Sequence, residues 1–464
     1  MDRCADWMLL KTIAVVGRNS NVPTATGCTR YGKTIEVSLS LEHPPRPSIL
    51  HVYSSRMNPS VPPNIICTVE DLLLFSVNTG SGPYSLSPDD CDYFIYRAHT
   101  SGPSLELLQR PHPYFNCNDI GLLPRSDGQY TVAVLIPTIS LDQFDLHLYH
   151  SDSKKWSSRT LPVKAPQQPF PVKIPPGSAR LHRHLSSSVI TIGGKDGTIG
   201  WVDHWRGILL CDLLNDENKL SLRGVPIPLP LEELSCTNED FPSGPGVQRR
   251  GIVYIRDKGL KLVHLEITAT QLPHKDPETD AISFNVENWA ITTWSNKHMT
   301  NLYKDWHKEC TVKASDITID NPAVSQVLES GLLMRNNGDS GEQLALQNIP
   351  VSQPTHCVNG KDVVYLVARK KYKHLRAWIV AVDMKNGKVQ AVEEFGTQKD
   401  LGSSIIYYPS IISKYMMTPP PGCFFPISSK ETHKEQLHVG LKPSYSDAEE
   451  SNDALEAWGG LEAA

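Results

Sequence analysis

The segment Ser188–Ile227, SVITIGGKDGTIGWVDHWRGILLCDLLNDENKLSLRGVPI, contains four apolar runs in succession. The runs are Ser188–Gly193, Thr198–Asp203, Gly207–Leu214 and Leu220–Ile227. Short runs rich in Val, Ile and Leu, bounded by Gly, Asp and Asn, are typical of β-strands joined by tight turns. The segment therefore predicts one small antiparallel sheet.

The same plan recurs along the chain, with little identity between the copies. Consecutive small sheets of about 40–50 residues are the sequence signature of a β-propeller. We predict an all-β, propeller-like fold of about six or seven divergent four-stranded blades. The clear units are Tyr130–Pro137, Asp145–His150 and Trp156–Val163; Gly251–Arg256 and Leu260–Thr268; and Val363–Arg369, Arg376–Asp383 and Lys388–Phe395. Weaker units are Val69–Val77 with Tyr93–Tyr96 and Leu105–Leu108, and Val286–Trp294 with Lys308–Ile319.

Proline content supports short elements and frequent turns. The chain has 36 prolines in 464 residues, and proline is excluded from helix interiors and central strands. Ala323–Leu333 is the one helix candidate. Lys385–Gly387 is the predicted turn after Asp383, and Asn386-Gly387 within it fits a tight hairpin, because both positions tolerate positive φ. The alternative architecture is two β-sandwiches in series, with the proline-rich stretch Leu161–Pro176 as their linker.

Charge is distributed unevenly. From Thr418 onward there are eight acidic residues and three lysines, whereas the rest of the chain has 42 acidic and 42 basic residues. We predict an N-terminal segment (1–64) that contributes strands to the propeller, a propeller-like domain (65–417) and a disordered acidic tail (418–464). The neutral body gives no electrostatic reason to expect nucleic acid or a membrane as a partner.

Cysteine and targeting patterns indicate an intracellular protein. The ten cysteines include no C-x-x-C pair, no N-x-[ST] glycosylation site occurs, and no apolar run approaches the ~18 residues of a membrane span. The apolar residues near the N-terminus are interrupted by Lys11, unlike a signal peptide. We expect a monomer in the cytoplasm or nucleus, not secreted, with no cofactor.

The stretch Trp201–Leu214, WVDHWRGILLCDLL, resembles the signature of the plant domain-of-unknown-function family numbered 1618, which is much expanded in grasses. The likeness covers roughly residues 65–417. The family has no established activity, so the resemblance implies no reaction. Related plant proteins join propeller-like modules to an F-box, but no F-box-like helical segment occurs here. Other parts of the likeness are Tyr93–Tyr96, Gly121–Arg125, Asp145–Tyr149, Asp362–Leu366 and Ala377–Asp383.

The signature residues are interpreted as structural. Thr198–Asp203 and Gly207–Leu214 are expected to be adjacent strands, with His204–Arg206 at their turn. The Asp203 carboxylate is expected to accept from backbone amides or to pair with Arg206 across the turn. The signature residues in this group are Trp201, Asp203, Trp205, Arg206 and Gly207.

Three motifs imitate known chemistry. Gly27–Thr34, GCTRYGKT, matches the phosphate-loop pattern, but no strand immediately precedes it, and a strand-like run, not a helix, follows it. Gly338–Gly341, GDSG, matches a protease nucleophile segment but is interpreted as a polar loop. His182 and His184, like His147 and His150, are interpreted as surface or turn residues, because Arg183 between the first two disfavours a metal.

No catalytic, cofactor-binding or metal-binding residue is therefore assigned. We predict a non-catalytic scaffold that holds a protein partner on the loop-bearing face of the propeller. One alternative is a metal-dependent hydrolase in the central channel, with Asp203, His204 and Asp362 as candidate ligands. Another is a ubiquitin-ligase substrate adaptor that lacks a recognisable F-box.

Overall fold

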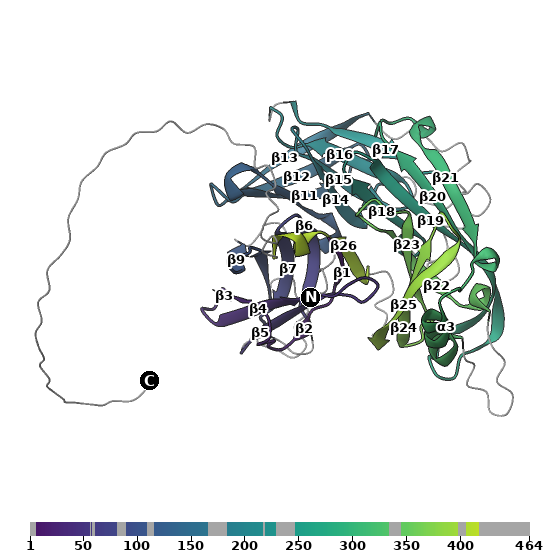
Figure 1. Cartoon of the computed structure of the whole chain (residues 1–464). Helices are drawn as coiled ribbons and strands as arrows, with labels where there is room; N and C mark the ends of the chain where they lie inside the picture. The colour runs from purple at the N-terminus through teal and green to yellow at the C-terminus, as the bar shows by residue number, and fades with distance from the viewer. Residues whose placement is uncertain are drawn as a thin grey trace, which may run out of the picture. The chain divides into compact units, whose positions relative to one another are not determined.

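The computed structural model is built almost wholly of β-strands, which confirms the predicted fold class (Figure 1). The described residues lie in one compact unit, Met1–Thr418. Within them, no helix is long and apolar enough to cross a membrane. The structure describes residues 6–55, 57, 61–80, 90–108, 116–165, 183–216, 219–228, 246–333, 345–397 and 405–416; the predicted acidic tail lies outside them.

Five blades are formed by consecutive strands. Each is a four-stranded antiparallel meander that begins at its innermost strand. The first contains β6 (Asn64–Val69), β7 (Leu72–Asn78), β8 (Cys91–Arg97) and β9 (Ser104–Leu108); the second β10 (Ile120–Pro124), β11 (Tyr130–Pro137), β12 (Gln143–His150) and β13 (Lys155–Ala165); the third β14 (Ser188–Gly193), β15 (Thr198–Asp203), β16 (Gly207–Asp212) and β17 (Leu222–Pro226). The fourth contains β18 (Arg250–Ile255), β19 (Gly259–Lys275), β20 (Ile282–Asn296) and β21 (His307–Lys313); the fifth β22 (Val351–His356), β23 (Val363–Ala368), β24 (Arg376–Asp383) and β25 (Lys388–Thr397).

The sixth blade combines segments from both ends of the described part of the chain. Its innermost strand β26 (Tyr407–Ser410) pairs antiparallel with β1 (Met8–Lys11). Strand β1 continues to the next strand through two backbone hydrogen bonds, from the Lys11 amide to the Ser48 carbonyl (3.0 Å) and from the Ser48 amide to the Leu9 carbonyl (2.7 Å). The outer strands are β5 (Ile49–Ser54), β4 (Thr34–Ser40) and β3 (Thr24–Cys28), and β2 (Val15–Val16) pairs parallel with β5.

The six innermost strands form a closed ring. Strands β6, β10, β14, β18 and β22 contact one another in that order, and β26 contacts β6. The contact between β22 and the start of β26, which completes the ring, is made by the Gln353 side chain. Its Oε1 accepts from the Ile406 amide at 2.8 Å. The Thr68 and Ser410 hydroxyls, 2.8 Å apart, join β6 to β26. This ring defines six blades, and two β-sandwiches in series do not describe it.

Neighbouring blades approach closely where the innermost strands carry glycine. A Cβ on Gly251 would lie 1.9 Å from the Pro354 carbonyl oxygen of the next blade, and one on Gly121 would lie 2.7 Å from Val189. At the outer edge of blades two and three, β13 pairs parallel with β17, which joins the two into an eight-stranded sheet.

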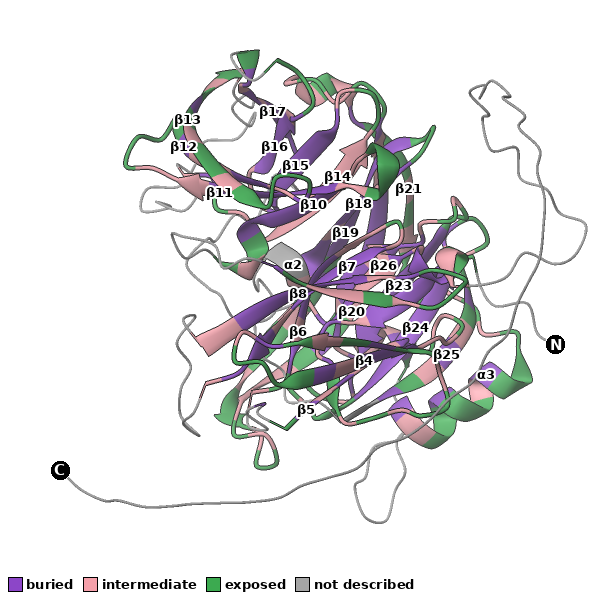
Figure 2. Ribbon diagram, turned by 90° about the vertical axis from the view of Figure 1, so that its left-hand side faces the viewer, coloured by how far each residue is buried: buried purple, intermediate pink, exposed green. Residues whose placement is uncertain are grey.

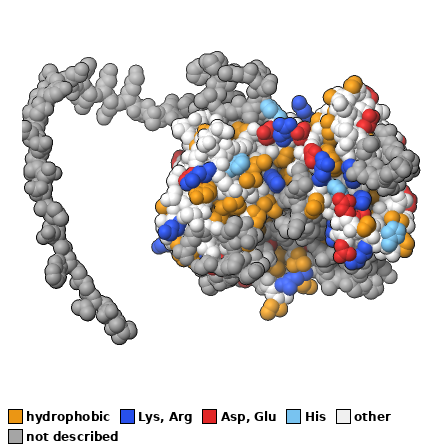
Figure 3. All heavy atoms as spheres, turned by 90° about the horizontal axis from the view of Figure 1, so that it is seen from below, with side chains coloured by type: hydrophobic (Ala, Val, Ile, Leu, Met, Phe, Trp, Pro, Cys, Tyr) orange, Lys and Arg blue, Asp and Glu red, His pale blue; other side chains and the backbone are white. Residues whose placement is uncertain are grey.

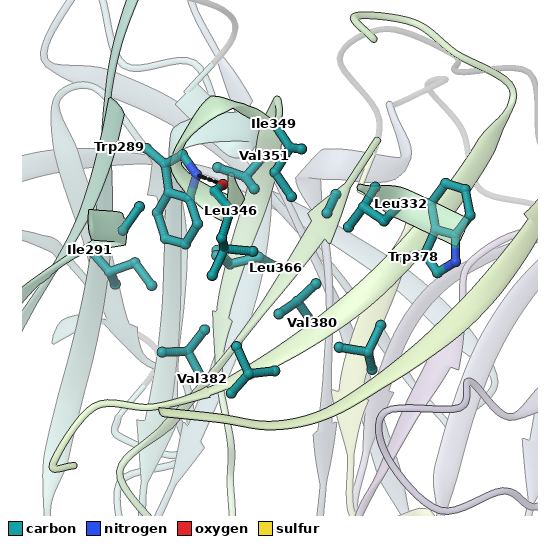
Figure 4. Close-up of a cluster of buried hydrophobic side chains, with 14 of the residues drawn as sticks. Trp289, Ile291, Leu332, Leu346, Ile349, Val351, Leu366, Trp378, Val380 and Val382 are labelled. Atoms are coloured by element: carbon teal, nitrogen blue, oxygen red, sulfur yellow. Dashed lines mark hydrogen bonds between the residues drawn. The ribbon is translucent and has the colours of Figure 1, made fainter. Parts of the chain in front are cut away.

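Apolar side chains fill the spaces between the blades, so that the strands are buried along much of their length (Figure 2). Figure 4 shows the core between blades four and five, where Trp289 Nε1 donates to the Leu346 carbonyl at 3.1 Å. A helix α3 (Pro322–Val327), continued by a π-helical turn (Leu328–Leu332), covers this core. It confirms the helix predicted at Ala323–Leu333.

Several local predictions need correction. Val69–Val77 is not one strand, because the chain turns at Glu70 (φ 52°) between β6 and β7. Strand β20, which contains Val286–Trp294, is not in a separate unit: it pairs with β19 in blade four, and this merger helps to reduce the blade count to six.

The predicted Asn386-Gly387 turn also differs. Only Gly387 has positive φ (62°) in the longer connection between β24 and β25, because the Asp383 carboxylate accepts from the Lys385 and Asn386 amides and holds the turn. The phosphate-loop pattern Gly27–Thr34 spans the turn of the β3–β4 hairpin, as its strand-like context suggested.

Candidate functional site: the axial cavity

A cavity of about 870 Å³ lies inside the ring of innermost strands. Each of these strands lies at the edge of its sheet. Apart from an isolated bridge between Asn64 of β6 and Ile13, the other edge of each strand presents backbone N–H and C=O groups to the cavity. The lining comprises residues 67–70, 121–125, 188–194, 250–256, 353–355 and 407–411, together with His204, Val358, Ile405, Lys414 and Tyr415.

The two ends of the cavity differ in exposure. Arg250 and His204, where the innermost strands begin, are 1% and 4% exposed. Glu70, Arg256 and Lys414, where these strands end, are exposed. We call the buried end, defined by Arg250, His204 and His264, the floor, and the exposed end, defined by Glu70, Arg125, Arg256, Lys414 and Tyr415, the mouth.

Arg250 organises the floor. Its Nε donates to His264 Nδ1 at 3.2 Å, and its Nη1 donates to the His204 carbonyl at 2.6 Å. Its guanidinium carbon lies 4.8 Å from the centre of the Trp205 ring, which is cation–π geometry. Because His264 Nδ1 accepts from Arg250, this nitrogen carries no proton.

The floor histidines are neutral. Burial, together with the nearby Arg250 charge, lowers the pKa of His204 to about 3. Burial likewise lowers the pKa of His264 well below its usual value, with Arg250 and Arg249 acting in the same direction. Arg250 is thus a positive charge held among uncharged imidazole, carbonyl and indole groups.

The signature residues build the β15–β16 turn that places His204 and Trp205 against Arg250. Asp203 Oδ1 accepts from the Trp205 amide at 2.9 Å and from the Arg206 amide at 3.2 Å. Its Oδ2 accepts from the Leu185 amide at 3.0 Å. Of the two arrangements left open for Asp203, its hydrogen bonds follow the first, acceptance from backbone amides.

The remaining signature residues fix this turn to its surroundings. Trp201 is fully buried, and its Nε1 donates to the Asp119 carbonyl at 2.8 Å. Gly207 begins β16 directly opposite Asp203. Burial lowers the pKa of Arg206, and the Asp203 charge opposes this shift. Among the signature residues, Trp205 contacts the floor arginine.

The mouth carries a short 3₁₀ helix, η9 (Ile412–Tyr415), after β26. Burial raises the pKa of Tyr415 to about 12; the charges of Glu70 and Asp71 act in the same direction, and Arg256 opposes them. The Tyr415 hydroxyl therefore lies near charges from both β6 and β18. Arg125 pairs with Asp152 (3.2 Å).

The candidate metal ligands Asp203, His204 and Asp362 do not converge. Only His204 lines the cavity; the Asp203 carboxylate holds its turn, and Asp362 is exposed before β23. Within the described ranges, no group of three or more His, Cys, Asp or Glu side chains could hold a metal ion.

The other candidate histidines are dispersed. His184 was predicted at the surface or in a turn, but it is buried, and its ring packs edge-on against Phe144. Burial lowers its pKa to about 4. His150 Nδ1 lies 3.0 Å from the Thr131 hydroxyl on the neighbouring strand. His182 and Gly338–Gly341 lie outside the described residues.

Sequence reasoning missed Arg250 and the mouth residues. The sequence pattern that they share is weak. Arg250 is the first residue of an innermost strand, and Arg125 and Arg256 come directly after innermost strands end. Charged residues in these places are equally typical of ordinary turns, so only the ring closure brings them together.

The geometry defines a six-bladed β-propeller with an axial cavity that has a buried floor. The family model described as "Protein of unknown function (DUF1618)" matches residues 201–365, which confirms the resemblance predicted from Trp201–Leu214. None of the curated proteins compared with the chain matches it.

Three solved structures are similar at low scores. An uncharacterised protein from Listeria monocytogenes is 9% identical, with 72% of this chain and 83% of that chain covered and a TM-score of 0.29. The α-L-arabinofuranosidase Arb93A from Fusarium graminearum is 11% identical (88% and 99% covered, TM-score 0.27). The WD40 domain of SCAP from fission yeast is 12% identical (84% and 86% covered, TM-score 0.29).

Proposed function

We propose that the chain is a non-catalytic interaction scaffold that binds an extended segment of a partner protein in its axial cavity. The observation that carries the proposal is the cavity wall, which is made of six strand edges that each lack a β-partner on the inner side. Unpaired strand edges bind extended peptides through main-chain hydrogen bonds, and alternate side chains then supply specificity.

The size and chemistry of the cavity support this proposal. About 870 Å³ accommodates a short segment but not a folded domain. Arg250 and Asp203 already have structural partners: Arg250 contacts His264 and the His204 carbonyl, and Asp203 holds a turn. This arrangement favours binding over acid–base or nucleophilic chemistry, which needs a polar group directed at a substrate.

Site-specific photo-crosslinking tests the proposal. Tyr415 at the mouth and Tyr31 on the outer β3–β4 turn, which is 43% exposed, are each replaced by p-benzoylphenylalanine in the full chain. After irradiation in a cell extract, we expect Tyr415 to capture a protein that Tyr31 does not. The captured protein, once purified, should bind the chain directly in calorimetry. Identical captures from both positions, or no direct binding, would contradict the proposal.

The two alternative functions remain predictions with tests of their own. A stoichiometric divalent ion in the purified protein would favour the metal-dependent hydrolase. Binding of the purified chain to a ubiquitin-ligase linker subunit would favour the adaptor. We expect the partner of the scaffold to be intracellular.

A further inference from the structure

We propose that the partner segment is acidic and docks at the mouth of the axial cavity through Arg256 and Lys414. This inference rests on the proposed scaffold function and specifies the chemistry of the ligand. It is carried by the charges of the lining residues, their ion pairs and their places in the fold.

The mouth concentrates positive charge from three blades. Arg125 follows β10, Arg256 follows β18 and Lys414 lies in η9, and Glu70 is the one acidic side chain among the described residues of the lining. The chain up to residue 417 has equal numbers of acidic and basic residues. The excess of positive side chains is therefore a property of the mouth and not of the chain as a whole.

Two of these cations, Arg256 and Lys414, are available to bind a ligand. Arg125 is committed to Asp152 at 3.2 Å. Arg256 and Lys414 are exposed and, among the residues that the structure describes, form no ion pair. Their charges come from β18 and from the segment after β26, two blades apart in the ring. A segment that enters the cavity between them can thus offer one carboxylate to each.

The floor contributes a further positive charge to the electrostatic field inside the cavity. Arg250 keeps its charge inside the cavity, whereas burial keeps His204 and His264 neutral. Clefts lined by one sign of charge, with walls of low dielectric constant, focus the field and raise the local concentration of the opposite charge. A negative segment is attracted along the whole axis, first by the mouth and then by Arg250.

An acidic peptide fits these features better than nucleic acid does. Nucleic-acid affinity depends on many phosphate contacts over an extended basic surface. Here the exposed cations at the mouth that form no ion pair in the described part of the chain are Arg256 and Lys414, and on the face shown in Figure 3 Lys and Arg side chains are interspersed with Asp, Glu and hydrophobic side chains.

Fluorescence anisotropy with defined probes tests the inference on the full chain. The probes are a fluorescein-labelled 12-residue peptide that alternates Glu with Ser and Gly, the same peptide with Gln for Glu, and a 12-nucleotide oligouridylate. We expect saturable binding of the glutamate peptide that weakens as salt increases, and at least tenfold weaker binding of the glutamine peptide.

Charge reversal locates the site. The variant Arg256→Glu/Lys414→Glu should bind the glutamate peptide at least tenfold more weakly than the wild-type chain. The matched control Lys308→Glu/Lys313→Glu alters two exposed lysines on the outer strand β21 by the same total charge and should bind as the wild type does. Circular dichroism should be the same for all three chains.

Three results would overturn the inference: equal binding of the two peptides, unchanged affinity of the Arg256/Lys414 variant, or tighter binding of the oligouridylate. The scaffold proposal fails separately. If Tyr415 captures a protein whose bound segment is neutral or basic, the scaffold stands and the acidic segment is wrong. If the glutamate peptide binds but no cellular protein is captured, the scaffold proposal fails.

Discussion

Strand β18 has an arginine at each end, and the two have opposite environments. Arg250, its first residue, is 1% exposed and contacts an imidazole, a carbonyl and an indole ring. Arg256, just after its last residue, is exposed and forms no ion pair with the residues described. The comparison teaches that position along the innermost strand, and not the residue type, determines whether an arginine is buried in the floor or exposed at the mouth, where we propose that it binds the partner.

The largest expected effect is at the floor. Arg250→Ala should lower the free energy of unfolding by about 3–5 kcal/mol, because it leaves a void and removes the partner of the buried His264 Nδ1. Urea denaturation at pH 7 measures this. Arg250→Lys should recover only part of the loss, since an ammonium group cannot reach both acceptors in the same plane. A loss below 1 kcal/mol for Arg250→Ala would show that the floor does not depend on this side chain.

The next effect concerns the contact between blades four and five. Gly251→Ala should lower the free energy of unfolding by about 3 kcal/mol, near the upper end for an overpacked site, because its Cβ would meet a backbone oxygen that cannot rotate away. Thermal denaturation measures it. Ser188→Ala on the innermost strand β14 serves as the control. If both variants melt at the wild-type temperature, the innermost strands are not in close contact.

Proton binding distinguishes the buried region from the mouth. Unfolded histidine titrates near pH 6.5, whereas burial lowers the pKa of His184 to about 4. Between these values the unfolded chain binds the proton and the folded chain does not, so this histidine destabilises the fold as the pH falls. The loss from pH 7 to pH 5 is about 2 kcal/mol for one such histidine. Burial raises the pKa of Asp119 to about 6, which acts in the opposite direction.

We therefore expect the urea midpoint to decrease from pH 7 to pH 5, since buried histidines outnumber Asp119. His184→Leu should reduce this decrease, whereas His307→Leu, at an exposed site on β21, should leave it unchanged. Equal decreases in the two variants would mean that His184 does not bind a proton on unfolding in this range.

The smallest expected effect on stability is at the mouth. Arg256→Ala should change the free energy of unfolding by less than about 0.5 kcal/mol, because exposed substitutions away from structural contacts are usually neutral. Matched melting curves of this variant and Arg250→Ala would show the contrast directly. A large destabilisation by Arg256→Ala would assign the mouth a structural role and weaken the binding proposal.

Much of the fold follows from local sequence. Near-continuous apolar runs at Tyr130–Pro137, Thr198–Asp203 and Arg376–Asp383 have the same bounds as β11, β15 and β24, because strands that are buried on both faces of a blade are apolar along their length. The meander order also follows, since short turns join antiparallel neighbours.

The blade count and the cavity depend on contacts that local patterns do not contain. The outer ends of the long strands β19 and β20 are polar, so the apolar pattern does not indicate that the two strands pair there. Strands β1 and β26 pair although they are separated by nearly the whole chain. Pro354 lies in β22, an edge strand of its sheet, at the point where the pairing with β23 is irregular, and both places tolerate proline. The floor combines His204, Arg250 and His264 from two blades, and no spacing rule relates them.

The pairing of β1 with β26 bears on synthesis of the chain. The ribosome releases Met8–Lys11 some 400 residues before Tyr407–Ser410, and at about 5–20 residues per second this delay lasts tens of seconds. During it, the Leu9 and Leu10 side chains, both fully buried in the finished ring, have no β26 to cover them. The nascent chain thus carries an open hydrophobic strand edge until its last blade emerges, the kind of surface that chaperones bind.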